Sequence, residues 1–187
     1  MNPIRHLGLA LLASLGISSA QAAEYTTIDP AQSQLTFAYQ QMGVAMEGRF
    51  SRFSSELRFD PEQVEAAQLQ LDVELASVDT GTADGNSELA TKDWFNTAAF
   101  PQARFVSTAV KALGNGQLEV HGTLDIKGQQ REIVIPAQFS TEGEQARFNG
   151  QFTIQRGSFS IGEGAWKAFD IVANDVTIHF KLQAGTH

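Results

Sequence analysis

Polar and apolar residues alternate one by one along much of this chain. The clearest run is residues 68–76, where Leu69, Leu71, Val73 and Leu75 share one parity and glutamine, aspartate and glutamate hold the other. Successive side chains of a β-strand point to opposite faces of the sheet, so a period of two predicts a strand with one buried and one solvated face. The alternation therefore predicts a mainly β, antiparallel protein.

Residues 33–61 contain two such runs, joined by a short connection that includes glycine. In the first run Leu35 and Phe37 set the apolar parity, and in the second run the apolar parity changes near Ser51 and Arg52. A shift of one residue would turn the whole apolar set to the other face of the sheet. We therefore expect a β-bulge at this point, which would keep both apolar sets on the same core.

Similar runs continue to the end of the chain. We expect further strands around residues 24–28, 102–110, 118–126, 133–139, 148–154 and 176–182. Interruptions are expected as a helical turn at 61–67, a short helix at 87–96 and a glycine-rich loop at 157–166. Eight or nine short strands with one helical insertion predict an antiparallel barrel or sandwich, and a closed barrel would leave no exposed edges.

The first 23 residues follow a different pattern. Arg5 precedes an apolar run at residues 7–17, and Ala20-Gln21-Ala22 has the small-x-small form of a signal-peptidase site. The apolar run is too short for a membrane span, which needs roughly 20 residues. We therefore expect a cleaved signal peptide at residues 1–23 and one domain at residues 24–187.

Composition narrows the classes of function. The 187 residues are 42% hydrophobic and 18% charged, with a formal net charge of −8 and no cysteine. Without cysteine there is no disulfide, no thiolate nucleophile and no cysteine metal site. An acidic chain without a basic cluster is also a poor ligand for nucleic acid.

Catalytic patterns are weak. None of the four histidines has a second histidine or a cysteine at metal-ligand spacing, so we expect no metal site. The carboxylates Asp79, Asp84 and Glu88 fall in the irregular segment, where a solvated loop is favoured over an active site. We therefore do not expect an enzyme, and keep an enzyme that uses these carboxylates as the less favoured alternative.

Aromatic residues are the main remaining feature. The chain has 13 phenylalanines, two tryptophans and two tyrosines, most of them in the alternating runs. An eight-stranded barrel is about wide enough either to be filled by side chains or to hold one small ligand. Periodicity alone leaves both outcomes open.

A series of short segments follows in a specific order and spacing: YTTIDP at 25–30, MGV at 42–44, GRF at 48–50, FDP at 59–61, ASVDTG at 76–81, WFN at 94–96 before FP at 100–101, FVST at 105–108 and RGSFSIG at 156–162. From residue 25 to about residue 184 the chain thereby resembles the YceI-like family of bacterial periplasmic proteins. The resemblance implies an all-β fold, an extended lipocalin-like, eight-stranded antiparallel β-barrel with one short helical insertion. It also implies a periplasmic protein that holds a long-chain polyisoprenoid or similar amphiphilic lipid in an elongated hydrophobic pore.

Some positions add to or depart from that pattern. The GEGAW segment at 162–166 resembles a branch of the family associated with membrane cytochromes of the b561 type. Gln41 and Lys127 stand where many members have histidine, and Asn96 stands where aspartate is usual. These differences concern polar contacts, and hence the head group of the ligand.

We expect the aromatic and aliphatic residues of the inner face to bind the ligand. The predicted pore-lining residues are Leu35, Phe37, Tyr39, Phe50, Phe53, Leu57, Phe59, Leu71, Val73, Phe105, Phe148 and Phe152. The residues predicted nearer the mouth, on the connections between strands, are Met42, Phe95, Phe159 and Trp166.

Other interpretations stay open at this stage. The ligand could be an isoprenoid quinone or a fatty amide, and the partner a membrane cytochrome b561-type protein or a second copy of the chain in a homodimer. A filled barrel with a structural role in stress is a further alternative.

Overall fold

The computed structural model describes residues 24–186. The predicted signal peptide at 1–23 therefore lies outside the described residues. The strands are β1 (Tyr25–Ile28), β2 (Gln34–Gln41), β3 (Val44–Phe50), β4 (Phe53–Arg58), β5 (Gln68–Glu74), β6 (Val78–Asp79), β7 (Gln102–Gly114), β8 (Gln117–Ile126), β9 (Gln129–Glu142), β10 (Gln145–Gln155) and β11 (Asp175–Thr186). The helix α1 spans Ala83–Ala90, and short 3-10 turns occur at Pro30–Gln32, Val64–Ala66, Leu75–Ser77, Arg156–Phe159 and Gly164–Trp166.

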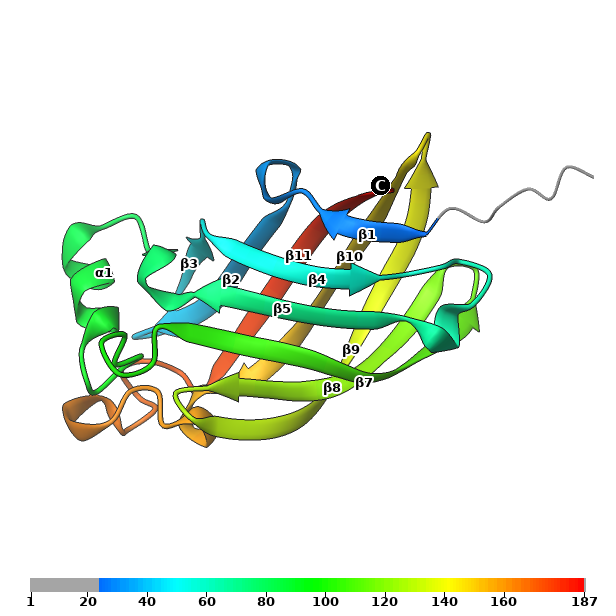
Figure 1. The fold of residues 1–187 in the computed structure, drawn as a ribbon. Helices are drawn as coiled ribbons and strands as arrows, with labels where there is room; N and C mark the ends of the chain where they lie inside the picture. The colour runs from blue at the N-terminus through cyan, green and yellow to red at the C-terminus, as the bar shows by residue number, and fades with distance from the viewer. Residues whose placement is uncertain (1–23, 187) are drawn as a thin grey trace, which may run out of the picture.

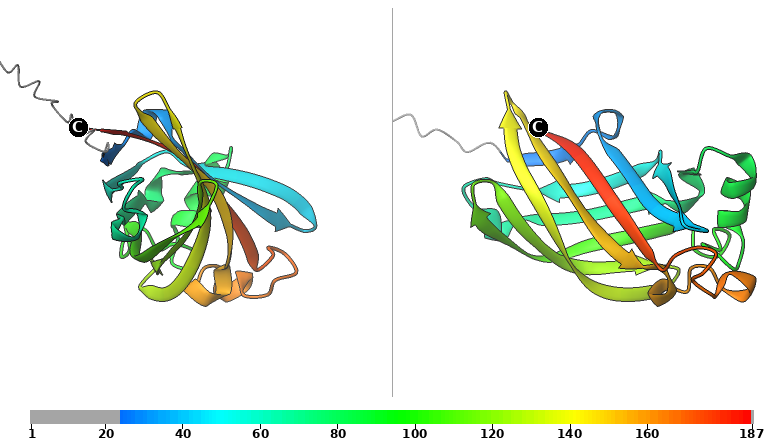
Figure 2. Two further views of the ribbon diagram at one scale, coloured as in Figure 1. Left: turned by 90° about the vertical axis from the view of Figure 1, so that its right-hand side faces the viewer. Right: turned by 180° about the vertical axis from the view of Figure 1, so that it is seen from behind.

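The strands form a single antiparallel sheet that curls around an apolar interior (Figure 1). Its order is β4-β5-β7-β8-β9-β10-β11-β2-β3-β6, and β1 pairs with β11. Seen from behind, the long strands of this sheet cross the molecule side by side, with α1 at one end (Figure 2, right). This is the predicted all-β barrel.

The barrel closes where β3 runs into β4. β4 is one end of the sheet order and β3 is next to the other end, where only the two-residue strand β6 follows it, yet β3 and β4 are separated in sequence only by Ser51 and Arg52. Counted as one kinked strand, they pair with β2 before the kink and with β5 after it, which leaves eight strands around the barrel. The expected irregularity at Ser51 and Arg52 is thus present, and it is the point at which the chain changes neighbours.

Most of the predicted strands form at the expected places, with bounds that differ by a few residues. The strand expected at 102–110 extends to Gly114 because it pairs with β8 as far as a tight hairpin. Phe105 is 5% exposed and Val106 is 39% exposed, which confirms that these neighbours face opposite sides of the sheet.

The predicted helix at 87–96 is displaced. Helix α1 begins earlier because the Thr82 hydroxyl accepts a hydrogen bond from the Gly85 N–H and caps its first turn. The Asn86 side chain also accepts hydrogen bonds from the Thr80 N–H and hydroxyl, which ties the helix to the end of β6. Residues 91–99 form turns rather than helix.

None of the helices within residues 24–186 is long and apolar enough to cross a membrane.

Candidate functional site

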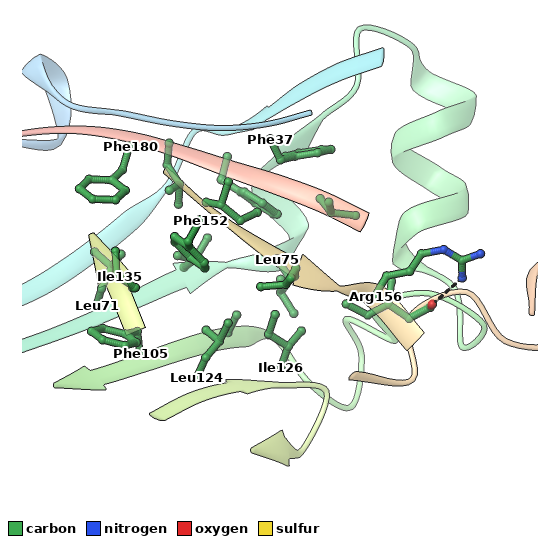
Figure 3. Close-up of a pocket in the computed structure, with 18 of the residues that line it drawn as sticks. Phe37, Leu71, Leu75, Phe105, Leu124, Ile126, Ile135, Phe152, Arg156 and Phe180 are labelled. Carbon is green, nitrogen blue, oxygen red and sulfur yellow. Dashed lines mark hydrogen bonds between the residues drawn. The ribbon is translucent and has the colours of Figure 1, made fainter. Parts of the chain in front are cut away.

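The interior of the barrel is an apolar cavity of about 530 Å³. This volume lies within the range of small-molecule sites, roughly 300–1,000 Å³. Aliphatic and aromatic side chains from facing strands converge on it, among them Phe37, Phe152 and Phe180 on one side and Leu71 and Phe105 on the other (Figure 3). The barrel is therefore hollow rather than filled by its own side chains.

Several aromatic rings lie flat on the wall because each of them covers a glycine on the neighbouring strand. A Cβ atom built on each of these glycines would come within 2.3–2.4 Å of the ring. The pairs are Phe37 over Gly48, Phe105 over Gly122 and Phe180 over Gly150. Because the rings occupy the space of a missing side chain, they project less into the lumen and leave room for a ligand.

The end of the cavity away from α1 is closed by aromatic packing. The ring centroids of Phe59 and Phe148 are 4.9 Å apart in an edge-to-face arrangement, and Phe139 lies 4.8 Å from Phe59. Tyr25 of β1 packs on the edge of Phe139 and is 4% exposed. Such pairs stabilise a core beyond the gain from area burial alone. We call this closed end of the cavity the aromatic floor.

The end beside α1 carries most of the polar lining residues. We call this end the polar end, and its polar members are Gln41, Thr80, Asp84 and Glu88. Asp84 is exposed to solvent although it lines the cavity, so the cavity reaches the surface here. Two further polar residues line the cavity: Arg156, which is described below, and Gln68, which lies at the opposite end, at the start of β5.

Both tryptophans of the chain are joined at the polar end by one carboxylate. Oε1 of Glu88 accepts hydrogen bonds from Nε1 of Trp166 at 2.8 Å and from Nε1 of Trp94 at 3.2 Å. The indole centroids are 5.5 Å apart. Since Glu88 belongs to α1 and Trp166 to the loop between β10 and β11, this contact connects the two segments that surround the opening.

A buried arginine supports the loop of residues 157–174. Arg156 is 1% exposed, and its guanidinium donates only to backbone carbonyl oxygens among the described residues. The acceptors are the carbonyls of Ile161, Gly162, Trp166, Ala168, Val172 and Ala173. Burial lowers the pKa of Arg156, yet an arginine remains charged at neutral pH.

Phe169 and Trp94 complete the surroundings of this charge. The guanidinium carbon lies 4.9 Å from the Phe169 ring centroid and 5.6 Å from that of Trp94. Arg156 also lines the cavity, on the side where α1 lies (Figure 3). Cation–π contacts and carbonyl dipoles together replace the water that this cation loses.

Lys127 has a related role in a neighbouring turn. Its side chain is 8% exposed, and Nζ donates to the carbonyls of Lys92 and Ser160 and to Oε2 of Glu163, at 2.7–3.0 Å. It therefore joins the turns after α1 to the loop after β10. Lys127 does not contribute to the cavity wall.

Comparison with known proteins places this geometry in a family. The YceI-like domain matches residues 26–184. The chain belongs to the YceI-like family. Its curated relatives include a UPF0312 protein of Pseudomonas syringae pv. tomato, 32% identical over 163 residues that cover 83% of each chain, and one of Vibrio cholerae, 34% identical over 141 residues that cover 74% of each.

Solved structures of other proteins share this fold. The crystal structure of Burkholderia cenocepacia BcnA has a TM-score of 0.82 and 37% sequence identity, and covers 84% of this chain and 99% of its own. A polyisoprenoid binding domain from Saccharophagus degradans has a TM-score of 0.68 over 89% of this chain and 100% of its own. At 20% identity, the second likeness shows the shared fold alone.

Most of the residues predicted from the sequence of this YceI-like chain line the cavity. They are Leu35, Phe37, Tyr39, Phe50, Leu57, Phe59, Leu71, Val73, Phe95, Phe105, Phe148, Phe152 and Trp166. Burial raises the pKa of Tyr39, in keeping with its place on an apolar wall. That these residues contact a ligand stays a prediction.

Three predicted residues lie off the wall. Met42 occupies a tight turn between β2 and β3 with φ 51°, which turns its side chain outward, and it is 75% exposed. Phe159 is 2% exposed and is enclosed in the core cluster with Leu75, because the 3-10 turn after β10 directs it inward. Phe53 directly follows the kink between β3 and β4, and packs against the cluster that contains Phe59.

Other lining residues were not among those predicted. They include Ile28, Leu69, Trp94, Val110, Leu118, Val120, Leu124, Ile126, Ile135, Ile154, Val176, Ile178, Phe180 and Leu182. Most lie in the same period-two runs, so their alternation was a usable signal. Glu88 was considered only as a carboxylate of the irregular segment, and Arg156 had no such signal, since its position depends on loop packing.

The carboxylates considered for catalysis have separate roles. Asp79 is paired with Arg49 at 2.8 Å and accepts a hydrogen bond from the Gly81 N–H. Both contacts hold the pKa of Asp79 below its ordinary value. Asp84 and Glu88 line the polar end. Within residues 24–186 no group of three potential ligands could hold a metal ion.

Proposed function

We propose that this protein is a periplasmic binding protein that holds one long-chain polyisoprenoid or similar amphiphilic lipid in its barrel, as a carrier, buffer or store. The observation that carries the proposal is the apolar cavity of about 530 Å³, whose polar members lie near its ends. The Saccharophagus degradans domain of the same fold is named for polyisoprenoid binding, which supports this class of ligand. The signal-like sequence at 1–23 supports the periplasmic location.

The energetics favour a carrier over a sink. Burial of a methylene group contributes about 0.8 kcal/mol, so a five-carbon prenyl unit contributes on the order of 3–4 kcal/mol before ordering costs. Three or four units exceed the roughly 8 kcal/mol that micromolar binding from water requires. The same tail is equally stable in a bilayer, so the protein would gain little by extracting it permanently.

Native mass spectrometry of the mature protein from a bacterial periplasm tests the proposal, followed by organic extraction of whatever it carries. A stoichiometric prenyl lipid would support it, and the ligand mass would separate a prenol from an isoprenoid quinone or fatty amide. An apo mass that stays unchanged after incubation with farnesol would contradict lipid binding.

Truncation of the wall provides a second test. Phe37 and Phe152 line the same side of the lumen, on the two strands that flank Ile178 of β11. The double variant Phe37→Ala/Phe152→Ala removes both rings from the wall (Figure 3), so it should weaken farnesol binding by at least about tenfold. The matched control is Phe53→Ala, which removes a half-buried ring that lies off the wall. Unchanged affinity in a folded double variant would reject this cavity as the lipid site.

Trp94 and Trp166 supply the measurement, since both line the cavity and are the two tryptophans of the chain. Ligand entry should change their fluorescence. A cytochrome b561-type partner and a homodimer remain predictions, and co-purification from membranes and sedimentation analysis would test them.

A further inference from the structure

The charged side chains on the cavity wall differ in whether a bound ligand can interact with them. Three charged residues line the cavity, namely Asp84, Glu88 and Arg156. Asp84 and Glu88 are four positions apart in α1, so they lie on the same face of the helix, one turn from each other. Both carboxylates therefore stand at the polar end, where the head group of a bound amphiphile would lie.

The cation on the wall cannot offset these carboxylates for a ligand. Nε, Nη1 and Nη2 of Arg156 all donate to backbone carbonyl oxygens of the 157–174 loop. An anion could pair with the guanidinium only by displacing those carbonyls, which would leave them buried without a donor. Lys127 is likewise tied to Glu163 and two carbonyls, and lies off the wall.

Glu88 has acceptor capacity left. Both indole N–H groups bind Oε1, and Oε2 accepts no hydrogen bond from the described residues. Gln41 and Thr80, the other polar members, are uncharged and can donate or accept. The polar end therefore suits a head group that donates a hydrogen bond, and repels one that carries negative charge.

We propose that the cavity selects amphiphiles with an uncharged, hydrogen-bond-donating head group, such as a prenyl alcohol, and that Asp84 and Glu88 exclude prenyl phosphates and long-chain carboxylates. This rests on the proposed function, because it assigns the head group of the lipid that the cavity holds.

Farnesol and farnesyl diphosphate test the proposal, because they share one tail and differ in charge. Titrations followed by tryptophan fluorescence should give an affinity for the diphosphate at least about tenfold weaker than for the alcohol, since two carboxylates near the head group repel it. Raising the salt concentration to about 0.5 M should reduce this difference in affinity between the two ligands, because salt screens the exposed Asp84.

Variants assign the exclusion to these residues. In the variant Asp84→Asn/Glu88→Gln the affinity for the diphosphate should come within about threefold of the affinity for the alcohol, because the amides carry no negative charge. The control Asp170→Asn removes an exposed carboxylate that does not line the cavity, and should leave the difference in affinity between the alcohol and the diphosphate unchanged. If the double variant fails to fold, the single variant Asp84→Asn, on an exposed position, should still reduce this difference in affinity.

The outcomes separate the two proposals. Equal binding of both ligands by the unmodified protein would overturn the selection and leave lipid binding intact. An affinity difference that stays the same in the variants would also overturn the selection by Asp84 and Glu88, because other groups would then exclude the diphosphate. Binding of neither ligand would reject the proposed function itself.

Discussion

Arg156 is the residue on which the opening of the barrel depends most. It is buried, it carries a charge, and its partners are carbonyls of a loop that has little regular structure. Backbone carbonyls in such a loop have no ladder partners, so a planar cation with five donors can satisfy several at once. The loop would otherwise bury unsatisfied carbonyls, which is costly.

Replacement of Arg156 by methionine should therefore destabilise the protein by about 3 kcal/mol or more, because it leaves those carbonyls without donors. Arg156→Lys should rescue only part of the loss, since an ammonium has three donors and no planar fork. Urea denaturation measures the effect. The control Arg58→Met removes an exposed pair with Glu24 and should cost less than about 1 kcal/mol.

Gly48 controls the width of the lumen at the residue scale. An alanine there would place its Cβ 2.3 Å from the Phe37 ring, so the ring must move into the cavity. We expect Gly48→Ala to cost about 1–3 kcal/mol and to weaken lipid binding. Gly185→Ala is the matched control, because nothing lies within 4 Å of its Cβ position. A further change of Phe37 to leucine should restore stability, and no rescue would argue against this mechanism.

At the scale of elements, the barrel is closed by a seam between the β3–β4 kink and the 3-10 turn Leu75–Ser77. The Ser51 N–H donates to the Ser77 carbonyl, and the Arg52 N–H donates to the Ser77 hydroxyl. The Arg52 guanidinium binds both carboxylate oxygens of Glu74 at 2.6 Å. These contacts replace the ladder hydrogen bonds that the kink interrupts.

Acid should weaken this seam. The hydrogen bond from Arg52 holds the pKa of Glu74 below its ordinary value of about 4.3. A group whose pKa is lowered by folding stabilises the folded state above its ordinary value, and that contribution is lost as the pH falls through the lowered one. The melting temperature should therefore drop below about pH 4.5.

Thermal melts from pH 6 to pH 3 measure this dependence. Glu74→Gln should reduce its slope, whereas Glu144→Gln, in the hairpin between β9 and β10, should not. If the melting temperature depends on pH identically in the Glu74→Gln variant and the parent, the Arg52–Glu74 contact is not the cause of the acid destabilisation.

At the scale of the whole molecule, the barrel places a cavity where most domains have a packed core. Packed interiors have few voids larger than a water molecule, so the unliganded protein lacks contacts that a bound tail would supply. Its stability without a ligand comes from the closed strand ladder, from the buried side chains packed around Leu75 and Phe105, and from the aromatic floor around Phe59. A ligand should therefore complete the core.

Removal of lipid should lower the thermal stability. Extracted protein should melt about 5–10 °C below the same protein saturated with farnesol, because ligand at 100 times its dissociation constant contributes about 2.7 kcal/mol. Differential scanning calorimetry measures the shift. The double variant Phe37→Ala/Phe152→Ala should show a smaller one, and equal shifts would place the ligand elsewhere.

The local pattern determined much of this structure. Period-two runs such as residues 68–76 and 176–182 predicted strands and their inner faces, because side-chain direction in a strand depends only on sequence parity. The parity change at Ser51 and Arg52 likewise located the kink. For the same reason the apolar wall was largely predictable, from Leu35 on β2 to Phe152 on β10.

Tertiary structure decided what parity cannot describe. Whether the aromatic rings would fill the barrel depended on cross-strand partners such as Gly48, which lets Phe37 lie flat. The start of α1 depended on a cap from Thr82, and the outward position of Met42 on a turn. The role of Arg156 came from carbonyls up to 17 positions away, brought together only when the loop folds over the barrel end. Such contacts join residues without a shared period, so the chain had to close before they existed.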